Sequence, residues 1–138
     1  MNLHPDFPVV SGDYQLSKSW SISLPFEMNR RLEEQDLVLW RPGYTIWMSI
    51  WGNDNNESIN ERIQWIETDS STEAYDFSID LNRTPPTVSY KLNDVRGEDV
   101  VYALYTFAFK DDGHIQMAIY VDHQSDFTTA QQIASSIQ

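Results

Sequence analysis

Residues 37–51 decide the fold of this chain, and they read Leu-Val-Leu-Trp-Arg-Pro-Gly-Tyr-Thr-Ile-Trp-Met-Ser-Ile-Trp. Two apolar runs, 37–40 and 44–51, flank Arg41-Pro42-Gly43. Proline presets the first central position of a type II turn, and glycine tolerates the positive φ that the second position requires. The stretch therefore predicts a β-hairpin that turns at Pro42 and Gly43.

Both faces of the predicted sheet are apolar. In residues 44–51, alternation places Trp47 and Trp51 on one face and the tyrosine and aliphatic side chains on the other. Residues 100–109 are apolar at both parities. Such a sheet needs cover on both faces, or it offers one face to a ligand or partner. If both helices covered one face, the Trp47/Trp51 face would be the binding surface.

The spacing of apolar residues predicts further strands and two helices. Strands are expected at 20–24, ending at Pro25, at 26–33 as a charged edge strand, and at 75–81, 88–92, 100–109 and 115–121. The turn Asp111-Asp112-Gly113 joins the last two. Helices are expected at 59–69, after a capping box of Ser58 and Glu61, and at 127–137, with Asp126 as N-cap.

These elements predict an α+β fold in one domain, residues 1–138, of which residues 1–12 are an extended leader. The sheet is expected to be mainly antiparallel, with about six to eight strands, because its neighbouring strands join as hairpins. Two flanking helices would complete an α/β/α sandwich.

The charge of the chain excludes one large class of partner. The 138 residues include 9 Lys and Arg against 21 Asp and Glu, a net charge of −12 that divides as −6 in each half. Binding to a phosphate backbone needs clustered basic residues, so we expect no nucleic-acid partner. The sequence has no cysteine, no signal-peptide pattern and no apolar run long enough for a membrane helix. We therefore expect a cytoplasmic protein without a membrane partner.

Catalytic, cofactor and metal motifs are missing from the sequence. His4, His114 and His123 lack metal-ligand spacing, and the last two bracket one predicted strand about 30 Å apart. Asp122 and His123 are adjacent on that strand, so they point to opposite faces. Residues 54–57 lack the spacing of a calcium loop. We expect no catalytic site, no cofactor, no metal and no enzymatic activity.

The scarce arginines provide a candidate interaction patch, because arginine and aromatic residues together often anchor partners. The patch comprises Arg30, Arg31, Arg41, Trp40, Tyr44, Trp47 and Trp51. The alternative is that these arginines neutralise Glu33, Glu34 and Asp36 across strands and that the tryptophans belong to the core.

The order of elements over residues 14–138 resembles the Mog1/PsbP-like group. The resemblance rests on Trp20–Pro25, which reads Trp-Ser-Ile-Ser-Leu-Pro, and on a final helix ending Ala134-Ser135-Ser136-Ile137. It implies an antiparallel sheet between helices, and a binding or assembly role without a shared catalytic site.

Two functional hypotheses follow from the sequence. The first is a small acidic, non-enzymatic protein-interaction module, such as an immunity-like or assembly factor, whose partner is a protein, for instance a basic one. A homodimer formed through the exposed sheet is a further option. The alternative is a small-molecule binding protein or enzyme. It would hold an anionic ligand in a pocket lined by Trp40, Trp47 and Trp51 and clamped by an arginine.

Overall fold

The predicted hairpin lies in the middle of the sheet. In the computed structural model, which describes residues 3–138, strand β3 (Asp36–Arg41) pairs with strand β4 (Tyr44–Gly52). Arg41 lies opposite Tyr44, so Pro42 and Gly43 form the two-residue turn. Gly43 has a φ of 87°, as the second central position of a type II turn requires. The structure confirms the hairpin.

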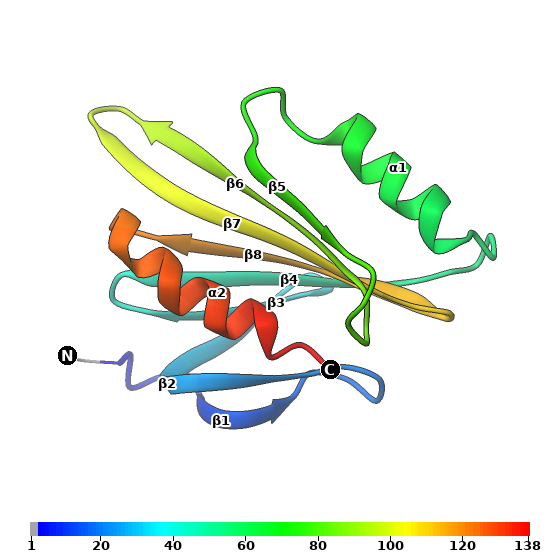
Figure 1. Ribbon diagram of the computed structural model, residues 1–138. Helices are drawn as coiled ribbons and strands as arrows, with labels where there is room; N and C mark the ends of the chain where they lie inside the picture. The colour runs from blue at the N-terminus through cyan, green and yellow to red at the C-terminus, as the bar shows by residue number, and fades with distance from the viewer. Residues whose placement is uncertain (1–2) are drawn as a thin grey trace.

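Eight strands form one antiparallel sheet (Figure 1). In spatial order they are β1 (Val9–Gln15), β2 (Ser21–Glu33), β3, β4, β8 (Gly113–Val121), β7 (Asp99–Lys110), β6 (Thr87–Arg96) and β5 (Tyr75–Asp80). Every neighbouring pair is antiparallel. The predicted α+β class is confirmed, with the strand number at the upper end of the expected range.

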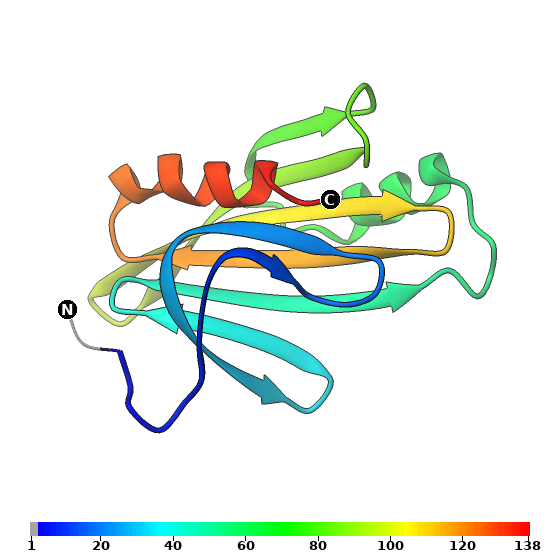
Figure 2. The same ribbon diagram turned by 90° about the horizontal axis from the view of Figure 1, so that it is seen from below.

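One face of the sheet is covered by helix α2 (Phe127–Ser135), which runs alongside β7 and β8 in Figure 2. Its buried residues Ala130 and Ile133 belong to a core with Ile46, Met117 and Leu104 from the central strands. The chain end is fixed beside it by two backbone hydrogen bonds of 2.9 Å between Ser21 and Gln138. Burial of the apolar side chains in this core favours folding.

The opposite face is covered at one end by helix α1 (Ile59–Asp69), which begins and ends where the sequence predicts. The Ser58 hydroxyl accepts a hydrogen bond from the Glu61 amide and so caps the helix. Ile63 and Ile66 pack with Phe107 and Phe109 of β7, whereas Leu104 of the same strand faces α2. Alternate residues of a strand point to opposite faces, so the two helices lie on opposite sides of the sheet. No described helix is long and apolar enough to cross a membrane.

The N-terminal predictions need two corrections. Residues 9–15 form β1, so the expected leader is wrong for its second part, and Met1 and Asn2 lie outside the described residues. The predicted strands 20–24 and 26–33 are one strand, β2, which continues through Pro25. The β1–β2 register shifts opposite this proline, between Val10 and Gly12. A proline is tolerated there because the irregularity removes the need for a ladder hydrogen bond from its nitrogen.

Asp126 occupies the predicted N-cap position of the final helix, but its side chain makes no capping hydrogen bond. Asp126 ends a short 3₁₀ helix, η1 (Gln124–Asp126), and its own backbone is helical, with φ −78° and ψ −5°. A capping residue needs an extended backbone to turn its side chain onto the first amides. Burial and the neighbouring Asp126 carboxylate raise the pKa of the Tyr44 hydroxyl, so the start of α2 lies close to β4.

Two glycines that face each other at the end of the β4–β8 pair provide a matched test of the register. A Cβ on Gly113 would collide with the Trp51 carbonyl oxygen, whereas a Cβ on Gly52 would meet only the Asp54 side chain, at 3.4 Å. We expect Gly113→Ala to lower the free energy of unfolding by about 1–3 kcal/mol and Gly52→Ala to lower it by less than about 1 kcal/mol. Urea denaturation measures both values, and equal losses would contradict the register.

Candidate functional site

A cavity of about 260 Å³ lies between helix α1 and the end of the sheet that it covers. Figure 1 shows this end, where β4 stops and β7 turns into β8 beneath α1. The residues that line the cavity come from all of these elements and from the loop between β4 and α1. They are Trp51, Gly52, Asn53, Glu57, Arg62, Trp65, Ile66, Phe109 and His114.

The loop between β4 and α1 is held by one side chain. The Asn53 side-chain amide donates to the carbonyl oxygens of Glu57 and Asp111, at 3.0 Å each, and its oxygen accepts from the Glu57 amide at 2.9 Å. The Asn53 backbone amide also donates to the Asp112 carbonyl oxygen. These bonds fix the loop to the β7–β8 turn, and the cap at Ser58 then sets where α1 begins.

Arg62 is the only arginine or lysine among the described residues that line the cavity, and it is buried, with 6% of its surface exposed. Its Nη1 donates to the Gly113 carbonyl oxygen at 3.0 Å, and its guanidinium carbon lies 5.2 Å from the centre of the Phe109 ring. Its Nε is buried and has no hydrogen-bond partner. None of the ion pairs in the described part of the chain includes Arg62. Among the described residues, the desolvated cation of the cavity therefore forms no ion pair.

His114 lies beside this cation as a neutral ring. It is stacked on Trp51, with centroids 6.3 Å apart, and contacts Phe109 at 6.0 Å. Burial and the charge of Arg62 lower the pKa of His114 from 6.5 to about 4. The imidazole is thus uncharged at neutral pH, and its Nδ1 is buried without a partner. Arg62 carries the positive charge of the cavity alone.

The lining offers groups for binding and few for chemistry. It contains no hydroxyl or thiol nucleophile, and Glu57 is its one carboxylate-bearing residue. Among residues 3–138, no group of three or more histidine, aspartate and glutamate side chains is placed to hold a metal ion. Four of the nine described lining residues, Trp51, Trp65, Phe109 and His114, carry aromatic rings. This arrangement suits an apolar molecule that carries a negative charge.

The predicted interaction patch does not form one surface, because its residues lie on opposite faces of the sheet. The β2–β3 and β3–β4 registers place Arg31, Trp40, Trp47 and Trp51 on the face of α1, and Arg30, Arg41 and Tyr44 on the face of α2. Of the seven, Trp51 alone lines the cavity. The alternation of strand residues explains this correction, since the sequence neighbours Arg30 and Arg31 must point apart.

Several residues of the patch have partners within the fold. Arg31 forms an ion pair with Glu33 at 2.8 Å and lies over the Trp40 ring. The Trp47 indole donates to Asp36 at 2.8 Å. The ion pair of Arg31 agrees with the alternative that these arginines neutralise nearby acids, but it forms within β2 and not across strands. Trp40 also contacts Phe7 of the N-terminal segment.

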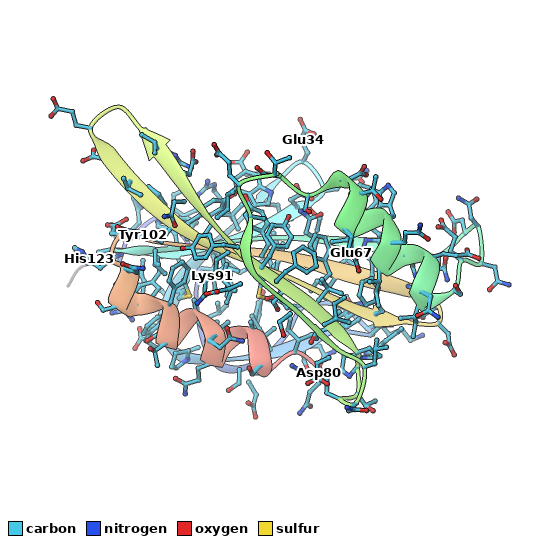
Figure 3. All side chains as sticks on the ribbon, turned by 45° about the horizontal axis from the view of Figure 1, so that its top comes forward. Glu34, Glu67, Asp80, Lys91, Tyr102 and His123 are labelled. Carbon is cyan, nitrogen blue, oxygen red and sulfur yellow. The ribbon has the colours of Figure 1, made fainter. Side chains whose placement is uncertain are left out.

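Acidic side chains occur on separate elements of the fold. Glu34, Glu67 and Asp80 stand well apart in Figure 3, on the β2–β3 turn, on α1 and at the end of β5. In the same view His123 lies at the end of the molecule away from α1. The spread agrees with the even division of charge along the sequence.

The sequence reasoning missed Arg62, Trp65, Phe109 and His114 as site residues. A signal for Arg62 was present, because it falls within the apolar stripe of α1 beside Ile63 and Ile66. A cation on the buried side of an amphipathic helix is unusual and indicates a special role. His114 gave no such signal, since it directly follows a turn.

Comparison with known proteins supports the fold alone. No family model matches the chain, and no curated protein matches it. A protein of Bacteroides thetaiotaomicron VPI-5482, whose crystal structure was determined at 1.50 Å, is similar in fold with a TM-score of 0.68 and 12% identity. The match covers 94% of this chain and 48% of that one, so this chain spans about half the length of that protein. The resemblance to the Mog1/PsbP-like group stays a prediction.

The lowered pKa of His114 predicts a specific loss of stability in acid. The unfolded chain protonates this histidine near pH 6.5 and the folded chain near pH 4, so the unfolded state binds more protons between these values. We expect the free energy of unfolding to fall by about 1–2 kcal/mol through this group as the pH drops across that window. In His114→Gln this contribution should be absent.

Urea denaturation between pH 4 and pH 7 measures the effect as the difference between the wild type and His114→Gln. The control is His123→Gln, which replaces an exposed histidine outside the cavity and should keep the wild-type dependence. If His114→Gln follows the wild type at every pH, the burial of His114 as a neutral ring is refuted.

Proposed function

We propose that this protein binds a small anionic organic molecule in the cavity beneath α1, with Arg62 as the anchor for its charge. The observation that carries the proposal is the burial of Arg62 without an ion-pair partner among the described residues. The sequence analysis offered such a ligand-binding role as its alternative hypothesis. The cavity retains Trp51 of the three tryptophans named there, and Arg62 replaces the arginines of the predicted patch.

The energetics of a buried cation favour an anionic ligand. A charged group in a low-dielectric interior is costly unless a partner compensates it. One hydrogen bond to Gly113 and a contact with the Phe109 ring compensate Arg62 only in part. An anion in the cavity would supply the missing charge beside the buried guanidinium, where the attraction is stronger than between two charges in bulk water. A bound carboxylate would meet a terminal nitrogen of the guanidinium, because Nε is buried.

The size and walls of the cavity limit the ligand. Ligand pockets commonly measure about 300–1,000 Å³, and this cavity of about 260 Å³ lies just below that range. It suits a molecule of one ring or a short chain. The indole rings of Trp51 and Trp65 and the side chain of Ile66 provide apolar area for its body.

Arg62→Met tests the anchor, since methionine has a comparable reach and no charge. We expect the affinity for benzoate or hexanoate, measured by isothermal titration calorimetry, to fall about tenfold to a hundredfold, because a charge-assisted hydrogen bond contributes about 1.5–3 kcal/mol. The free energy of unfolding without ligand should stay within about 1 kcal/mol or rise, because an apolar side chain replaces an unpaired buried cation.

Arg83→Met is the matched control. Arg83 donates to the carbonyl oxygens of Ser135 and Ile137 at 3.1 Å each, so it holds the end of α2 and lies outside the cavity. This variant should lose stability and keep the wild-type affinity for both carboxylates. The proposal fails if neither carboxylate binds the wild type, or if Arg62→Met loses stability as Arg83→Met does while its binding is unchanged.

A further inference from the structure

We infer that the ligand of this cavity is an aromatic monocarboxylate, a flat ring that carries a single negative charge. The inference rests on the proposed function and adds two requirements for the ligand: it is flat, and it carries one negative charge. Different residues of the cavity impose each requirement, so each can be tested separately.

Flatness is selected by tryptophans from two different elements. Trp51 belongs to β4 and Trp65 to α1, and both line the cavity while 54% of each residue is exposed. The Trp51 ring is stacked on the His114 ring, and the His114 ring in turn contacts Phe109. Such rings favour stacked or edge-on contact with another ring over contact with a puckered aliphatic ring of the same size. A planar ligand would therefore cover exposed indole surface and extend an existing stack.

A single charge is selected by the balance of charges around the cavity. Arg62 is its one cation, because the neighbouring His114 is neutral at the pH of the cell. Glu57 belongs to the same lining, so a second negative charge on the ligand would find no positive partner there.

The surroundings of the cavity strengthen this selection. The Asn53 hydrogen bonds hold the loop that carries Asp54 against the turn of Asp111 and Asp112, beside the cavity. These carboxylates, in a chain of net charge −12, repel anions in general. Arg62 would compensate one negative charge of the ligand, whereas the nearby carboxylates would repel a second negative charge.

Two pairs of probes, each matched in size, separate the selections. Benzoate and cyclohexanecarboxylate differ in flatness at equal charge, and 4-carbamoylbenzoate and terephthalate differ by one charge at equal shape. By calorimetry at pH 7, we expect benzoate to bind about threefold to tenfold more tightly than cyclohexanecarboxylate. We expect 4-carbamoylbenzoate to bind at least about tenfold more tightly than terephthalate.

Single substitutions assign the two selections to their residues. Trp65→Leu should abolish the preference for benzoate over cyclohexanecarboxylate, whereas Phe77→Leu, which changes an exposed aromatic residue outside the cavity, should keep it. Glu57→Gln should narrow the gap between terephthalate and its monoamide about threefold or more. Glu61→Gln, an exposed acid in the first turn of α1, should leave that gap unchanged.

The outcomes distinguish this inference from the proposed function. Equal affinities within either probe pair, or probe preferences that Trp65→Leu and Glu57→Gln leave intact, would overturn the aromatic monocarboxylate. Binding that still depends on Arg62 would then leave the proposed function standing. If none of the four carboxylates binds the wild type, both proposals fail together.

Discussion

The pairing of β4 with β8 is the interaction on which the rest of the structure depends. All other neighbouring strands in the sheet are consecutive in the sequence, whereas these two are separated by α1 and three strands. They pair without interruption from Tyr44 opposite Val121 to Gly52 opposite Gly113. The pair joins two meanders, β1–β4 and β5–β8, and its buried side chains Ile46 and Ile119 lie in the core under α2. Without it, neither meander would have a complete face for α2 to cover.

The same pairing builds the cavity. It places Trp51 opposite His114, and the hairpin of β7 and β8 places Phe109 opposite the same histidine. Because side chains alternate along a strand, a slip of one residue would turn His114 toward α2 and away from Arg62. Helix α1 lies between β4 and β5 in the sequence, so the register also decides which face of the sheet its arginine meets. The positions of Trp51, His114 and Arg62 in the cavity thus depend on the register of the β4–β8 pair.

Local patterns predicted the parts of the fold that depend on local physics. The Pro42-Gly43 turn and the Ser58 cap need only neighbouring residues, and both elements begin or turn where predicted. Strand β1 was missed because Val9–Gln15 is mostly polar and obtains its stability from pairing with β2. Of the residues that line the cavity, the predicted interaction patch included only Trp51. The β7–β8 hairpin brings Phe109 to His114, but Trp51 meets His114 only through the β4–β8 pairing, and no sequence pattern specifies a pairing at that distance.

The unpaired state of Arg62 links stability to binding. The chain has more than twice as many acidic as basic residues, yet in its described part no carboxylate pairs with this guanidinium. Folding therefore proceeds against the cost of one desolvated charge, and the aliphatic and aromatic cores on the two faces of the sheet offset it. An anion that binds only the folded chain would return part of that free energy, and it would stabilise the fold in proportion to the logarithm of its concentration. The cation that weakens the empty fold is thus the group that would let a ligand strengthen it.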